Sequence, residues 1–363
     1  MIAAWSRAFL GQPWSAIALA LGLGSIGAVC FFQLGLPLAP LLGAMWANTI
    51  AALLGARVHV PNAARNVMIM ILGVFLGSAF TPDLAANLMR WSLTLSGLGV
   101  YVAIGTAAGA AYLRYAVKRD PVTSYFTAVP GGLSEMILTG TKMGGDERFI
   151  ALSHVLRIML VVLGVALWFK FFAGYDRVGG NLPGPPWSTL SSTDLGLLAA
   201  CSVGWPLASW LRLPTPMLLG PLIVSAAIHL GGLTGSRPPR ELIVGAQVVL
   251  GSAVGCRFVG ANWIYFLRTV RSAFGLAGIM LTLTFATALI FQAFTGYDFA
   301  PLVLAFAPGG LAEMSLVALA LGEDPAFVAT HQVIRIIVIL MLASNIFRWF
   351  VAPRLKQPPD DAD

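Results

Sequence analysis

The sequence predicts an all-α integral membrane protein with two inverted repeats, about ten transmembrane helices and two re-entrant or broken segments. Three observations carry this prediction: a shortage of charge, a series of long apolar runs, and one motif that occurs twice. Only 10% of the 363 residues are charged, against about 25% in an average soluble domain. The mean hydropathy is +0.83, and Gly and Pro are frequent, as they are in transmembrane helices. This composition excludes a water-facing globular domain.

The apolar runs form two series separated by a polar segment. A bilayer core about 30 Å thick needs roughly 20 apolar residues per helix. Runs of about this length predict a first repeat over 1–172, a Gly/Pro-rich linker at 173–191, a second repeat over 192–352 and a polar tail at 353–363. The runs lie near 14–36, 37–56, 66–81, 91–114, 121–143 and 149–172, and then near 192–212, 214–233, 241–258, 270–296, 299–322 and 326–352.

The two series also share sequence, which predicts a tandem duplication. Pro130–Arg157 begins PGGLSEM and Pro308–Arg335 begins PGGLAEM, and without a gap the two segments are identical at 13 of 28 positions. The offset between them is 178 residues. Matching LP…LLG and LGS segments lie earlier in each half.

The orientation of the halves depends on whether the PGGL segments cross the membrane. If they re-enter, each half has five spans and the repeats are inverted; if they span, there are twelve spans and parallel repeats. Re-entry concentrates Lys and Arg more strongly on the N-terminal side, leaving Arg90, Lys170, Arg177, Arg237 and Arg240 opposite. The positive-inside rule therefore favours ten spans with both termini in the cytoplasm. The same rule accounts for the net charge of +7, so no nucleic-acid partner is predicted.

The PGG triplets are predicted to break helices at membrane depth. Proline lacks an N–H and glycine tolerates any backbone geometry, and the freed backbone groups need protein or water to satisfy them. We expect the amides that follow each break to face a solute or an ion. The alternative is a tight turn between packed helices. The residues concerned are Pro130, Gly131, Gly132, Pro308, Gly309 and Gly310.

Four charged residues inside apolar segments are the main candidates for function. Glu135 and Glu313 follow the two breaks and are predicted to bind a coupling proton or Na⁺. Arg157 and Arg335 each follow their glutamate by 22 residues. They are expected either to bind a solute carboxylate through the bidentate guanidinium or to pair with the glutamates and serve structure alone.

Weaker candidates are polar residues that share these segments. His154 and His331 lie one helical turn before the arginines, although Gln332 takes the place of His154 in the second repeat. Packing is the alternative for all of them. No spacing suits a metal site, a nucleotide-binding loop or a catalytic triad, so neither a metal, a cofactor nor an enzyme is predicted. The remaining weak candidates are Ser78, Ser252 and Gln247.

With both PGGLxEM boxes in place, the chain from about residue 14 to 352 resembles the membrane AbrB-duplication family. These bacterial integral-membrane proteins are often labelled AbrB-family regulator or ammonia monooxygenase. The resemblance implies the duplicated membrane architecture, whereas nothing in the sequence reads as a DNA-binding module. A copper monooxygenase would need a ligand cluster that four scattered histidines do not offer.

The function predicted from these features is secondary transport of a small organic solute, with carboxylate-bearing solutes as one class. The predicted site is the crossing of the two broken PGGL helices in a bacterial inner membrane. A membrane sensor of the same fold, without net transport, is the alternative, and a membrane monooxygenase is a distant third. The expected partners are a small-molecule solute and the lipid bilayer. The sequence leaves open whether the chain forms a homo-oligomer.

Overall fold

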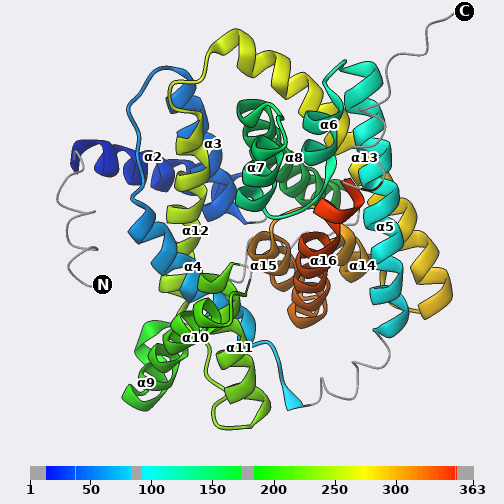
Figure 1. Cartoon of the computed structure of the whole chain (residues 1–363). Helices are drawn as coiled ribbons and strands as arrows, with labels where there is room; N and C mark the ends of the chain where they lie inside the picture. The colour runs from blue at the N-terminus through cyan, green and yellow to red at the C-terminus, as the bar shows by residue number, and fades with distance from the viewer. Residues whose placement is uncertain are drawn as a thin grey trace, which may run out of the picture. The chain divides into compact units, whose positions relative to one another are not determined.

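The computed structural model describes residues 14–36, 38–82, 91–172, 184–213, 215–347 and 349. Every regular element in these ranges is helical, which confirms the predicted all-α class (Figure 1). The N-terminal residues before Trp14, most of the predicted linker and the C-terminal tail lie outside the described residues. In the first half the helices are α2 (Trp14–Gln33), α3 (Ala39–Leu53), α4 (Asn62–Gly77), α5 (Ser92–Ala111), η2 (Tyr112–Ala116), α6 (Pro121–Ala128), α7 (Leu133–Lys142) and α8 (Glu147–Phe172).

The second half repeats this order of helices after a short turn, η3 (Trp187–Thr189). The predicted run at 192–212 is divided by a 3₁₀ turn. The helices are α9 (Ser192–Ala200), η4 (Cys201–Val203), α10 (Gly204–Trp210), α11 (Pro216–Leu230), α12 (Arg240–Gly255), η5 (Cys256–Phe258), α13 (Trp263–Thr295), α14 (Phe299–Phe306), α15 (Leu311–Leu321) and α16 (Pro325–Ile346).

The helices identify a multi-pass membrane protein. Six described helices are long and apolar enough to cross a bilayer, among them Trp14–Gln33, Glu147–Phe172 and Trp263–Thr295. Four further apolar helices are shorter, including Ala39–Leu53 and Asn62–Gly77. At 1.5 Å per residue, a helix of 15 residues is about 22 Å long, which is less than the roughly 30 Å of a hydrocarbon core. By length and composition, six of the described helices are therefore candidate spans.

Helix boundaries recur at the spacing of the sequence match. Helix α6 begins at Pro121 and α14 at Phe299, 178 residues later, and both have eight residues. Helices α4 and α12, which begin at Asn62 and Arg240, show the same offset and both have 16 residues. These two pairs of helices therefore match in position and length, whereas α5 with 20 residues and α13 with 33 differ in length.

The chain divides into two compact units, and each unit draws on both halves of the sequence. Unit 1 comprises Met1–Arg90, Leu163–Trp263 and Leu311–Ala329. It holds α2 to α4, α9 to α12 and α15. Unit 2 comprises Trp91–Val162, Ile264–Gly310 and Thr330–Asp363, and it holds α5 to α7, most of α8, α13, α14 and α16.

In unit 1, helices from one half of the sequence pack against helices from the other. Helix α4 of the first half lies against α11 of the second, and α12 of the second half lies against α3 of the first. A Cβ atom on Gly77 of α4 would overlap the carbonyl oxygen of Leu222 in α11. Equally, a Cβ on Gly255 of α12 would lie 2.6 Å from the carbonyl oxygen of Met45 in α3. Small residues permit this close backbone approach, as is usual between membrane helices. The two halves thus make the same contact in both directions.

Unit 2 is held together by aromatic and hydroxyl contacts. The Tyr101 hydroxyl of α5 and the Thr284 hydroxyl of α13 are hydrogen-bonded at 2.9 Å. Tyr125 and Phe126 of α6 pack against Phe347, with ring centroids 5.4 and 5.1 Å from it. These contacts bring α6 against the end of α16, and they place the first PGG break inside the unit.

Candidate functional site

Both PGG segments break the helix as the sequence predicts. Val129 and Ala307, which precede Pro130 and Pro308, are extended, with φ and ψ of −56° and 123° and of −55° and 132°. A residue before proline avoids the helical region because the proline ring would clash with it. Helix α6 therefore ends at Ala128 and α14 at Phe306, and new helices begin after the glycines.

The first break is the tip of a hairpin in which α7 returns along α6. The Asp146 amide, just after α7, donates to the Thr123 hydroxyl near the start of α6, at 2.8 Å. Near the end of α7, a Cβ on Gly140 would lie 3.1 Å from Cβ of Phe126. At the base of the hairpin, Arg119 Nη1 and Asp146 Oδ2 form an ion pair at 3.5 Å. The two ends of the segment 119–146 therefore lie close together.

Arg157 of α8 binds the backbone carbonyls that the first break leaves free. Its Nη1 donates to the carbonyl oxygens of Thr127 at 3.2 Å and Val129 at 3.1 Å, with a longer contact of 3.4 Å to Ala128. The last four carbonyls of a helix have no partner within the helix. A cation at this end also meets the negative pole of the helix dipole. Arg157, which is 2% exposed, thus caps the C-terminus of α6 from inside the protein.

His154 completes this cap. Its Nε2 lies 2.8 Å from the Phe126 carbonyl oxygen, and its Nδ1 lies 3.0 Å from Arg157 Nη2. A carbonyl only accepts and a guanidinium only donates. The ring must therefore carry its proton on Nε2 and be neutral.

The second break has the same cap, built from a different pair of residues. Arg335 of α16 donates from Nη1 to the Ala307 carbonyl at 2.7 Å and from Nη2 to the Gly309 carbonyl at 2.9 Å. Gln332 Nε2 donates to the carbonyls of Leu304 at 2.9 Å and Ala307 at 3.1 Å. Leu304 and Phe126 are 178 residues apart, so Gln332 and His154 bind equivalent carbonyls.

The expected ion pair between Glu135 and Arg157 does not form. Across the described ranges the ion pairs are Arg119–Asp146 and Arg240–Glu241. Arg157 binds backbone carbonyls at the end of α6 instead of the Glu135 carboxylate. Glu313 and Arg335 lie in different units, and their pairing stays a prediction.

The caps leave several buried polar atoms without a partner. Nε of Arg157 and Nε of Arg335 have no hydrogen-bond acceptor, and the hydroxyls of Thr127 and Ser153 and Oε1 of Gln332 are also unpaired. Leaving such a group unsatisfied costs about 1–3 kcal/mol, and more if it is charged. Unit 2 therefore holds spare donors and acceptors beside both breaks.

The two guanidinium groups act on each other electrostatically, and both also act on the Tyr101 hydroxyl. They are 2% and 3% exposed. Two buried positive charges repel each other. The partial charges of the carbonyls that bind the guanidinium groups offset this repulsion only in part. Unit 2 therefore holds two buried positive charges beside the two breaks.

Glu135 is the third residue of α7, and its carboxylate folds back over the break. A Cβ on Gly132 would overlap Oε2 of Glu135. This is the position at which an acid complements the positive end of the helix dipole. The carboxylate is partly exposed, so an ion has access to it.

Glu313 occupies the same position in α15 and belongs to unit 1. The charge that acts on it there is that of Arg65 in α4. Arg65 was not among the predicted site residues, because it lies near the polar end of its apolar run. A meeting of Glu135 and Glu313 at one crossing stays a prediction.

Three of the weaker candidates form hydrogen bonds within the protein, and only that of Ser78 is local in sequence. His331 Nε2 and the Thr94 hydroxyl are hydrogen-bonded at 2.9 Å. Ser78 donates to the Phe75 carbonyl in its own turn, and Ser252 accepts from Asn48 Nδ2 at 3.0 Å. Oε1 of the buried Gln247 has no hydrogen-bond partner. The two serines match the alternative in which they serve helix packing.

Sequence reasoning did not identify Thr127, Ser153 and Gln332 as parts of the site. Gln332 had a usable signal, since it stands at the repeat position of His154. Ser153 had the same signal, since it stands at the repeat position of His331, whereas Thr127 had none, because its counterpart is Ala305. Only the structure shows that their hydroxyls lie buried without partners.

Comparisons with known proteins agree with the resemblance seen in the motifs. The model of the family described as Transition state regulatory protein AbrB matches residues 40–351. "Uncharacterized protein YhjN" of Bacillus subtilis (strain 168) is 30% identical over 298 residues, covering 77% of this chain and 76% of that protein. "Putative regulator AbrB" of Escherichia coli (strain K12) is 27% identical over 341 residues, covering 93% of this chain and 96% of that protein.

Proposed function

This chain belongs to the family described as Transition state regulatory protein AbrB, and we propose that it is a secondary transporter of a small carboxylate-bearing solute. The solute binds in unit 2 beside the two PGG breaks. A proton or Na⁺ supplies the coupling, and the protein works in the bacterial inner membrane with both termini in the cytoplasm.

One observation carries this proposal. Arg157 and Arg335 are buried beside the breaks, form no ion pair among the described residues, and each keep an unpaired Nε–H. A buried charge is retained in a membrane protein mainly for function. A carboxylate would accept from these spare donors, and it would offset the repulsion between the two guanidinium groups.

The proposal includes an architecture of two inverted repeats, with ten spans and two re-entrant PGGL hairpins. Broken elements of inverted repeats form the solute sites of many secondary transporters. The return of α7 along α6 supports re-entry of the first segment. The 178-residue recurrence of helix boundaries and the reciprocal packing of α4 and α12 support the duplication.

Glu135 and Glu313 carry the coupling ion in this proposal. Each is the third residue of the helix that follows a break. Protonation or Na⁺ binding would remove a negative charge that otherwise repels the anionic solute. Coupling would then follow, because the solute and the cation bind more tightly together than alone.

Uptake by the purified full-length chain in proteoliposomes tests the proposal. We expect saturable uptake of at least one labelled small carboxylate, driven by an imposed pH or Na⁺ gradient. Glu135→Gln and Glu313→Gln should reduce gradient-driven uptake by at least tenfold. Glu147→Gln, which changes an exposed acid at the start of α8, is the matched control and should retain uptake.

Two results would contradict the proposal. Gradient dependence that is unaltered in both glutamate variants would make these acids structural. Carboxylate binding without any flux would favour the alternative, a membrane sensor of the same fold. The word regulator in the name of the Escherichia coli relative agrees with that alternative.

A further inference from the structure

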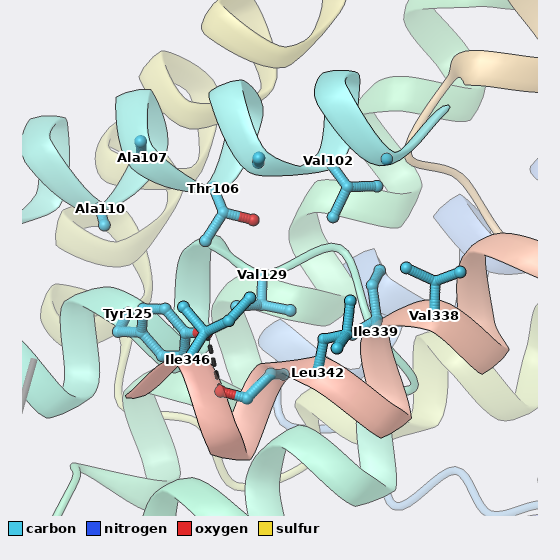
Figure 2. A pocket seen from close by; sticks show the side chains of 13 residues that line it. Val102, Thr106, Ala107, Ala110, Tyr125, Val129, Val338, Ile339, Leu342 and Ile346 are labelled. Atoms are coloured by element: carbon cyan, nitrogen blue, oxygen red, sulfur yellow. Dashed lines mark hydrogen bonds between the residues drawn. The ribbon is translucent and has the colours of Figure 1, made fainter. Parts of the chain in front are cut away.

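Unit 2 contains an apolar cavity of about 440 Å³ between α5, α6 and α16 (Figure 2). This volume falls within the roughly 300–1,000 Å³ of ordinary small-molecule sites. Thr106 and Tyr125 are the polar side chains among its thirteen lining residues. The Tyr125 hydroxyl is already engaged, because it donates to the Ala343 carbonyl at 2.8 Å. The cavity is open on one side, since Gly99, Ala103 and Ala107 are exposed, and its apolar walls favour apolar groups over water.

Small residues on one face of α5 create the space. Ala103, Ala107 and Ala110 line the cavity together with Gly99, and their spacing of three or four residues places them on one side of the helix. Figure 2 shows Ala107 and Ala110 on α5 facing the side chains of α16. The sequence of α5 therefore keeps open a volume that larger side chains would fill.

The cavity adjoins the break and its arginine caps. Val129 lines the cavity, and its carbonyl accepts from Arg157. Ile339 also lines the cavity, and a Cβ on Gly131 would lie 2.9 Å from its Cγ2 atom. Arg335 precedes Ile339 by one turn of α16. Neither arginine lines the cavity, but Val129 joins the cavity wall to Arg157, and Ile339 lies one helical turn from Arg335.

We propose that the ligand of this site is an amphipathic carboxylate whose carboxyl group lies at Arg157 and Arg335 and whose unbranched apolar chain of several carbons fills the cavity. The proposal rests on the proposed function, and it adds the class of solute. A short polar acid would leave the cavity empty, and a neutral apolar compound would leave the arginine donors unpaired. An amphipathic acid satisfies both parts of the site.

Binding of a homologous series to the full-length protein in nanodiscs tests this proposal. The probes are the sodium salts of linear acids from acetate to octanoate, measured by titration calorimetry with empty nanodiscs as the reference. Affinity should rise by about fourfold per added methylene until the cavity is full. Octanoate should then bind at least a hundredfold more tightly than acetate.

Two phenylalanine variants of α5 separate the cavity from the lipid surface. Ala107→Phe places a ring in the cavity and should weaken the dependence on chain length, while acetate binds as before. Ile104→Phe, at a side chain that is 51% exposed and outside the cavity lining, is the matched control and should keep the dependence. A thermal-unfolding midpoint within a few degrees of wild type checks that both variants are folded.

The outcomes distinguish this proposal from the proposed function. Equal affinity for acetate and octanoate in the wild type overturns the cavity assignment and leaves transport of a small carboxylate standing. A chain-length dependence as steep in Ala107→Phe as in the wild type also overturns it, because the gain would then come from the surrounding lipid. If no acid of the series binds and none is taken up, both proposals fall.

Discussion

His154 and Gln332 show how two different side chains solve one local problem. Each sits at the same repeat position and binds the equivalent carbonyl near the end of a short helix, that of Phe126 in one half and of Leu304 in the other. His154 is neutral in this arrangement, as Gln332 always is. The requirement at this position is therefore a neutral side-chain donor that reaches the helix end.

This requirement predicts the effects of two substitutions at His154. His154→Gln should change the free energy of unfolding by less than about 1 kcal/mol, because the amide can replace the ring donor. His154→Leu leaves the Phe126 carbonyl unpaired and should cost roughly 1–3 kcal/mol. Thermal or denaturant unfolding of the detergent-purified chain measures the difference. Equal destabilisation by both variants would contradict the predicted role.

Pairs of helices in unit 1 approach each other through glycine. On α2 and α3, a Cβ added to Gly27 would overlap the carbonyl of Gly43, and a Cβ on Gly43 would overlap that of Gly27. Gly204 of α10 and Gly220 of α11 make the same reciprocal contact. Because lipid chains are as apolar as these helices, close packing is the main force that holds such pairs together.

The glycine contacts predict a difference between two alanine substitutions on α2. Gly27→Ala should destabilise the protein by roughly 1–3 kcal/mol, because the backbones must separate to admit the methyl group. Gly22→Ala is the matched control, since its Cβ would meet no atom within 4 Å. It should be neutral or stabilising by up to about 1 kcal/mol through helix propensity. Unfolding midpoints of the two variants decide the matter, and similar losses in both would refute the packing role.

Neither half of the sequence forms a compact unit of its own. Each compact unit takes helices from both halves. The hairpin 119–146 begins and ends at one place, where the Arg119–Asp146 ion pair lies. Every later helix would run in the opposite direction if this segment re-entered the membrane instead of crossing it, so the segment decides between inverted and parallel repeats.

Cysteine accessibility from the two sides of the membrane tests the inverted arrangement. In a chain whose three native cysteines are replaced by serine, Lys118→Cys and Glu147→Cys should both react with a membrane-impermeant thiol reagent only from the cytoplasmic side. Asp298→Cys and Asp324→Cys, which flank the second PGGL segment, should react only from the opposite side. All four positions are exposed. Labelling of Lys118→Cys and Glu147→Cys from opposite sides would instead support twelve spans and parallel repeats.

Composition and repetition in the sequence were enough to predict the membrane class, the helices, the two breaks and the family. These features depend on local chemistry, namely apolar length, proline and glycine, and a motif that occurs twice. The partners of Arg157 and Arg335 were decided by the tertiary structure, because backbone carbonyls exist at every residue and carry no sequence signal. They become acceptors only where a helix ends against another helix, and the folded hairpin alone brings the end of α6 against Arg157.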